Sequence, residues 1–177
     1  KTFTTSLLCK AINEGKIDLD NSIDEYLTLP DKDYYPTIKR LVTHTSGYKG
    51  HYFEKPMISN FLSGKNDFNG ITGKMLIERL GKIDLDDSDY SFKYSNFGIA
   101  SLGAVLEQLY DNDFETLINS YITDDLELLN TKISDGTGDL KNYWEWSQKD
   151  AYMPAGALVS NITDMMMYVQ MHMACNP

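Results

Sequence analysis

Apolar residues along this chain recur mainly at intervals of three and four positions, the spacing that places them on one face of an α-helix. Strict alternation of apolar and polar residues, typical of a half-buried strand, is scarce. Together with capping and glycine residues, the apolar repeats predict helices at 3–12, 23–27, 36–47, 72–80, 99–109 and 114–122. A last helix, rich in methionine over 165–173, is predicted to be capped by Asn161-x-x-Asp164. The segment 48–70, rich in Gly, Asn and Ser, is predicted to be a loop. We therefore expect a mainly α protein with at most a small hairpin.

Two of the predicted helices follow one another directly and have regular apolar faces. Successive amphipathic helices bury such faces most simply against each other. The residues that we expect in the core on this ground are Ile99, Leu102, Leu106, Phe114, Leu117 and Ile118.

Length, charge and cysteine content narrow the class of protein. The 177 residues suit a single domain with a sizeable core. The formal net charge of -10 argues against a nucleic-acid partner, because such a partner requires a basic surface. Acidic residues gather at 84–89 and 124–127, and we interpret both clusters as solvated faces. Cys9 and Cys175 define neither a disulfide framework nor a metal-ligand spacing, and we expect Cys9 to be a small buried residue on an apolar helix face.

Four short segments carry the chemical information. They read Lys-Thr-Phe-Thr-Thr at 1–5 (followed by Glu-Gly-Lys-Ile-Asp-Leu-Asp at 14–20), Leu-Val-Thr-His-Thr-Ser-Gly at 41–47, Tyr-Ser-Asn-Phe-Gly at 94–98 and Pro-Ala-Gly-Ala-Leu-Val-Ser at 154–160. In this order and spacing, the segments resemble those of the serine β-lactamase and penicillin-binding protein superfamily. Within it they are most similar to the branch of class C β-lactamases, D-alanyl-D-alanine carboxypeptidases and esterases. The resemblance extends over essentially the whole chain.

The resemblance implies catalytic roles for three residues. Lys1 corresponds to the lysine of a Ser-x-x-Lys motif, in which one helical turn brings serine and lysine to the same face. Tyr94 and Asn96 correspond to the Tyr-x-Asn motif: Tyr94 would be a base or proton shuttle, and Asn96 would hold Lys1 or a substrate amide. No cofactor or metal is implied. Each motif residue also has a structural interpretation, Tyr94 as a half-buried tyrosine and Asn96 as the N-cap of the helix after it.

Two other residues of these segments are interpreted as structural. His44 stands between two threonines just before Ser-Gly, and we expect it to end a helix and organise a loop away from the chemistry. Gly156 is expected to serve close backbone packing or a positive φ.

Two elements of the family pattern lie outside these 177 residues. They are the nucleophilic serine, expected three residues before Lys1, and the Lys/His-Thr/Ser-Gly strand motif. Ser6 is no substitute, because no lysine follows it at three residues. The resemblance therefore implies that residues 1–177 are the helical domain of an α+β fold, with most of the sheet domain absent.

From this we expect the chain to be a fragment of a serine hydrolase that forms an acyl-enzyme. The substrate of its parent protein would be a small molecule or a peptide, namely a β-lactam, a peptidoglycan peptide or an ester, in a bacterial and extracytoplasmic setting. The fragment alone is expected to be inactive, with Lys1 exposed at a fraying end, and to self-associate through the surface that the sheet domain would cover. The alternative is a non-catalytic helical binding module derived from the same scaffold.

Overall fold

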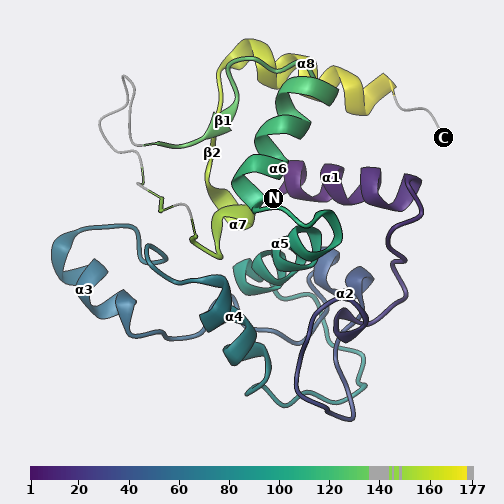
Figure 1. Cartoon of the computed structure of the whole chain (residues 1–177), viewed down its shortest axis with the longest axis vertical. Helices are drawn as coiled ribbons and strands as arrows, with labels where there is room; N and C mark the ends of the chain where they lie inside the picture. The colour runs from purple at the N-terminus through teal and green to yellow at the C-terminus, as the bar shows by residue number, and fades with distance from the viewer. Residues whose placement is uncertain (136–143, 145, 148, 175–177) are drawn as a thin grey trace.

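The computed structural model describes residues 1–135, 144, 146, 147 and 149–174, and these form a mainly helical structure (Figure 1). The α-helices are α1 Thr2–Asn13, α2 Ile38–Val42, α3 Pro56–Ser63, α4 Gly73–Leu80, α5 Asn96–Tyr110, α6 Phe114–Ser120, α7 Met153–Gly156 and α8 Ile162–Ala174. A 3-10 turn at Ile23–Glu25 and a π turn at Tyr121–Asp125 add to them. Strands β1 Lys132–Ile133 and β2 Leu158–Val159 pair antiparallel, with Lys132 opposite Val159. The predicted fold class is confirmed, although a long connection rather than a tight turn joins the two strands.

Helix α5 lies at the centre of the molecule, where α1, α2, α4, α6 and α7 contact it (Figure 1). Its small residues make this close approach feasible. A Cβ added to Gly103 would lie 2.1 Å from Cγ of Pro154, so α5 and α7 meet almost backbone to backbone. At its start, Ser95 Oγ accepts a hydrogen bond from the Gly98 N–H at 2.8 Å and caps the helix. The position of α5 therefore determines where the residues just before it are held.

The core forms largely as the apolar pattern predicts. Five of the six expected residues, all except Leu117, are buried, and Leu117 is partly buried against the same cluster. The apolar faces of α5 and α6 thus pack together, as their succession in the sequence predicted.

The prediction that 48–70 is a loop throughout was wrong, because α3 lies within it. Pro56 occupies the first turn of α3, where its missing N–H costs nothing, and Gly64 ends the helix in the left-handed conformation with φ 66°. Three large apolar side chains of α3, Ile58, Phe61 and Leu62, are exposed. The helix is only eight residues long and lies in a segment rich in Gly, Asn and Ser, which is why the loop was predicted instead.

The prediction for Cys9 was wrong, whereas that for the start of the last helix holds. Cys9 is exposed, because the face that α1 buries consists of Phe3, Thr4, Leu7, Leu8 and Ala11, and position 9 points away from it. The predicted cap of the last helix is confirmed: the helix begins at Ile162, and Asn161 Oδ1 accepts a hydrogen bond from the Asp164 N–H at 2.8 Å.

Both acidic clusters are on the surface, as predicted. Arg40 lies over the first of them, with Nη2 3.3 Å from a carboxylate oxygen of Asp87. In the part of the chain described here, no helix has the length and apolar character needed to cross a bilayer.

Candidate active site

Lys1, Tyr94 and Asn96, which the sequence places far apart, line a single cleft of about 270 Å³. Lys1 stands at the start of α1, and the other two flank the start of α5. Nζ of Lys1 lies 4.8 Å from the centroid of the Tyr94 ring and donates a hydrogen bond to the carbonyl oxygen of Ala155 in α7. The three predicted site residues are therefore brought together by α1, α5 and α7.

Lys1 is half-buried, which corrects the expectation of an exposed, fraying end. The reason is that the first turn of α1 is anchored on both sides. Thr4 Oγ1 donates to the carbonyl of Pro154 at 2.7 Å, and the ring of Phe3 stacks on Tyr168 with centroids 3.9 Å apart. The carbonyl and the aromatic face that Lys1 meets are both partners that suit an ammonium group.

Tyr94 is 53% exposed and not the half-buried tyrosine of the structural interpretation. Its ring lies against that of His44, with centroids 5.0 Å apart. Asn96 is the first residue of α5, and its neighbour Ser95 supplies the cap, so the N-cap interpretation of Asn96 was wrong. The capping task falls on Ser95, and the Asn96 side chain lines the cleft instead.

His44 holds the backbone on both sides of Tyr94. Its carbonyl oxygen accepts from the Lys93 N–H at 2.8 Å, and its Nδ1 accepts from the Ser95 N–H at 3.2 Å. The residue itself has φ 58°, in the left-handed region that few non-glycine residues adopt. Burial, and secondarily the charge of Lys1, lower the pKa of His44 below its usual value and favour the neutral ring that this acceptor role requires. The expected loop-organising role agrees with this geometry, but the expectation that His44 lies away from the site was wrong.

Neither role expected of Gly156 is observed. Its φ is not positive, and a Cβ added to it would meet no atom within 4 Å. The close approach is made by Gly103 instead. Gly156 is exposed and lines the cleft, so the absence of a side chain leaves this part of the cleft open.

Four aromatic side chains complete the cleft, and sequence reasoning assigned them no part in it. They are Phe68, Trp144, Trp146 and Tyr152. Phe68 stacks on Tyr152 with centroids 4.2 Å apart and ring planes inclined by 15°. Burial raises the pKa of the Tyr152 phenol well above its usual value, so this ring stays uncharged. No spacing rule could have found the set, because Phe68 and Tyr152 come from segments more than eighty residues apart.

Other chemically active groups lie elsewhere. Ser6 shares a hydrogen bond of 2.7 Å with the hydroxyl of Tyr168 and does not line the cleft. Among the described residues, no three His, Cys, Asp or Glu side chains are grouped so as to hold a metal ion. The available chemistry is therefore that of an amine, a phenol and an amide beside an aromatic wall.

This chain is similar to known proteins of one family. A family model described as Beta-lactamase matches residues 1–174. A Dichelobacter nodosus protein that carries the name fimbrial assembly protein FimD, serogroup D, is 34% identical over 126 residues, which are 68% of this chain and 30% of that protein. The "Beta-lactamase-like protein 2" of Dictyostelium discoideum is 29% identical over 151 residues, 81% of this chain and 26% of that protein.

Solved structures show the same fold. A β-lactamase/D-alanine carboxypeptidase from Pseudomonas syringae superposes with a TM-score of 0.74 at 18% identity, covering 99% of this chain and 49% of that one. The octameric penicillin-binding protein homologue of Pyrococcus abyssi gives 0.73 at 19% identity, with 99% and 44% covered. The chain thus spans about half the length of these structures and less than a third of the two relatives above.

Proposed function

The chain belongs to the Beta-lactamase family, and on this basis we propose that the protein containing it is a serine hydrolase that works through an acyl-enzyme. The observation that carries the proposal is the meeting of Lys1 Nζ with the Tyr94 ring and the Ala155 carbonyl, in a cleft that Asn96 also lines.

The proposed chemistry begins with activation of a serine. In the family pattern the serine precedes Lys1 by three residues, and one helical turn would bring its hydroxyl to the side of α1 that carries Lys1. A serine hydroxyl is a weak nucleophile and needs a base beside it. We assign that role to Tyr94 in its phenolate form, whose negative charge the Lys1 ammonium would stabilise. The phenolate would accept the serine proton while the serine oxygen bonds to the acyl carbon of the substrate.

Asn96 and Lys1 would then bind and orient the substrate. The Asn96 amide can donate to a substrate carbonyl and accept from a substrate N–H. Lys1 donates a hydrogen bond to the Ala155 carbonyl, which would orient its ammonium group toward the reacting atoms. As the bond between the acyl carbon and the leaving group breaks, Tyr94 would donate to the leaving group the proton that it accepted from the serine, and the serine would remain acylated.

Residues 1–177 alone are proposed to be inactive. Acyl transfer needs a nucleophile, a base and oxyanion donors held in one site. The family's serine and its Lys/His-Thr/Ser-Gly motif are not among these residues.

A labelling experiment tests both statements. The protein containing this chain, with its preceding serine, is incubated with a fluorescent penicillin and with a fluorogenic ester, and adducts are read by mass spectrometry. We expect a stoichiometric adduct on that serine and none on residues 1–177 alone. An adduct on the isolated chain would show that the nucleophile has been misassigned.

The second candidate is a non-catalytic interaction module. It is favoured by one observation, the 34% identity to a protein named for fimbrial assembly. The same labelling experiment decides, because an interaction module would form no adduct even with the serine present.

A further inference from the structure

We infer that helix α3 is a docking surface for an anionic phospholipid bilayer, which its exposed apolar side chains and its flanking lysines would contact together. The inference concerns a surface outside the cleft and does not rest on the proposed function. In Figure 1, α3 lies at the outer edge of the molecule, apart from the helices that pack around α5.

The first argument is that α3 turns its apolar side to water. Ile58, Phe61 and Leu62 stand at positions i, i+3 and i+4, which places them on one face of the helix. They are 55%, 79% and 78% exposed, whereas Asn60, on the opposite side of the helix, is buried. A surface helix of a globular protein normally buries its apolar face and exposes its polar one. An apolar face exposed in this way marks a site of interaction.

The second argument is that α3 is held in this orientation. Nδ2 of Asn60 donates to the carbonyl oxygens of Asp67 and Asn69, at 3.2 and 2.7 Å, and ties the back of the helix to the loop that follows it. Before the helix, Nη2 of Arg79 in α4 donates to the carbonyl of Phe53 at 2.9 Å. The apolar face is therefore preformed, which lowers the entropic cost of binding.

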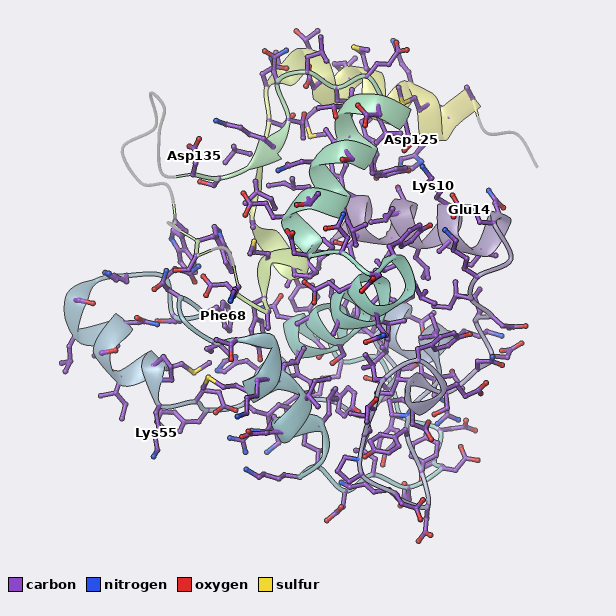
Figure 2. All side chains as sticks on the ribbon, viewed as in Figure 1. Lys10, Glu14, Lys55, Phe68, Asp125 and Asp135 are labelled. Atoms are coloured by element: carbon purple, nitrogen blue, oxygen red, sulfur yellow. The ribbon has the colours of Figure 1, made fainter. Side chains whose placement is uncertain are left out.

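The third argument is charge, which selects the partner. Residues 49–65 contain three lysines and one acidic residue, Glu54, in a chain of net charge -10. Glu54 is itself paired with Arg79, with Oε1 2.7 Å from Nε. Lys55 and Lys65 are exposed at the two ends of α3, and Figure 2 shows Lys55 extending outward from the start of the helix. Lysines beside apolar side chains match an anionic bilayer, because their ammonium groups reach the phosphates while their stems lie along apolar groups.

Two other interpretations of the surface are less favourable. Pairing of two copies through α3 would bring the lysines of both copies together, which disfavours a second copy as the occupant. Helix α8 also exposes apolar side chains, but its thirteen residues include no Lys or Arg, so it lacks the charge that would attract anionic lipid. Helix α8 therefore provides a control for apolar exposure alone.

Vesicle sedimentation tests the inference, with the protein that contains this chain and, separately, with residues 1–177. The probes are vesicles of phosphatidylcholine alone and vesicles of phosphatidylcholine mixed with phosphatidylglycerol. We expect both proteins to bind the anionic vesicles, and to bind the neutral vesicles at least about tenfold more weakly. High salt should weaken binding to the anionic vesicles, because it screens exposed charges.

Phe61→Ser combined with Leu62→Ser should weaken binding to the anionic vesicles by at least about tenfold, because it removes most of the apolar face. Both side chains are exposed, so the fold should be preserved, which circular dichroism checks. Ile162→Ser combined with Met166→Ser removes two exposed apolar side chains from α8 and should bind as the wild type does.

Lys55→Glu combined with Lys65→Glu tests the charge separately, because it leaves the apolar face unaltered. This variant should lose the preference for anionic vesicles. Lys16→Glu combined with Lys39→Glu makes the same change of charge at two exposed lysines outside residues 49–65 and should keep the preference.

Absence of vesicle binding, or equal binding to the two kinds of vesicle, would overturn the inference. So would unchanged binding of the variant with serine at 61 and 62, or a loss confined to the α8 control. Binding by residues 1–177 but not by the longer protein would show that other parts of that protein cover α3. A dimer that the same substitutions at 61 and 62 convert to monomer, without vesicle binding, would make a second copy the occupant.

Discussion

Nδ1 of His44 accepts a hydrogen bond from the backbone N–H of Ser95 at 3.2 Å, across fifty-one positions of sequence. Ser95 is the cap of α5 and stands between Tyr94 and Asn96. Since the His44 carbonyl also accepts from the Lys93 N–H, one residue positions the backbone before and after Tyr94. A protonated imidazole has no acceptor, so the arrangement depends on His44 being neutral.

This dependence predicts a loss of stability on acidification. The pKa of His44 is lowered in the folded chain, chiefly by burial, so the unfolded chain takes up the proton first as the pH falls. Neutral His44 therefore contributes fully to the free energy of unfolding above the pKa of about 6.5 that histidine has in the unfolded chain. This contribution is lost as the pH falls through the lower pKa of the folded chain. We expect His44→Asn, which cannot be protonated, to flatten this part of the curve of unfolding free energy against pH.

The measurement is urea unfolding of both chains from pH 7.5 down to pH 4.5, with the Ser95 amide followed by NMR over the same range. His172→Asn, at an exposed histidine on α8, is the matched control and should keep the wild-type slope. If His44→Asn and wild type lose stability in parallel, the His44–Ser95 hydrogen bond does not govern this range.

Some helices of this chain could be predicted from the sequence and one could not. Where a helix buries one face, as α5 does with Ile99, Leu102 and Leu106, periodicity alone located both the helix and its core residues. For the short helix α3, inside a segment rich in Gly, Asn and Ser, the same rule failed. Helix α3 has only eight residues, fewer than the window over which an apolar period can be established, and only Met57 of its apolar side chains packs against the core.

The residues of the cleft also fall into those that the sequence could predict and those that it could not. Lys1, Tyr94 and Asn96 could be identified because the motifs that carry them are short and local. The role of His44 beside Tyr94 and the stacking of Phe68 on Tyr152 depend on which segments α5 and α7 bring together. Such contacts arise from tertiary packing and leave no spacing in the sequence from which to infer them.

Because α5 packs closely on α7, a single methyl group added at Gly103 is predicted to lower the free energy of unfolding. Gly103→Ala would place Cβ 2.1 Å from Cγ of Pro154, and one of the helices must shift to accommodate it. We expect a loss of ~1–3 kcal/mol or more in unfolding free energy, as for other overpacked cores. Gly73→Ala, at a helical glycine whose added Cβ meets nothing within 4 Å, is the control and should be neutral or stabilising by ~0.4–1 kcal/mol. Equal stability of the two variants in urea would contradict the close contact.

The core of α5 gives a second stability prediction. Leu106 is completely buried, so Leu106→Ala should cost ~2–5 kcal/mol through lost apolar contacts and the cavity that remains. Leu129→Ala removes the same atoms from an exposed position and should change stability by no more than ~0.5 kcal/mol. Urea unfolding of both variants measures the difference, and a cost below 1 kcal/mol at Leu106 would argue against this packing.

Self-association is predicted from the outer face of α8. Ile162, Met166, Val169 and Met173 are all exposed and spaced by four, three and four residues, which aligns them in one apolar stripe. A continuous apolar stripe in water favours burial against a second copy. We expect residues 1–177 to dimerise at high micromolar concentration, and Val169→Lys to shift the equilibrium to monomer. Gln170→Lys adds the same charge beside the stripe and should leave the dimer in place. Sedimentation velocity distinguishes these results, and a monomer at all concentrations would refute the prediction.

Tyr94→Phe in the protein that contains this chain tests the proposed base. Removing only the hydroxyl keeps the ring that meets Lys1 and His44, so the fold and the position of Lys1 should be preserved. A general base is typically worth ~10²–10⁴ in rate, and we expect the rate of acylation by a penicillin or an ester to fall by a factor in that range. The loss should appear in kcat, with KM little changed, because the hydroxyl is assigned to proton transfer and not to substrate binding.

Tyr110→Phe, which removes the hydroxyl bonded to Glu14 at the far end of α5, is the matched control and should retain full activity. Full activity in Tyr94→Phe would transfer the role of base to Lys1, whereas equal losses in the two variants would mean that the effect is structural.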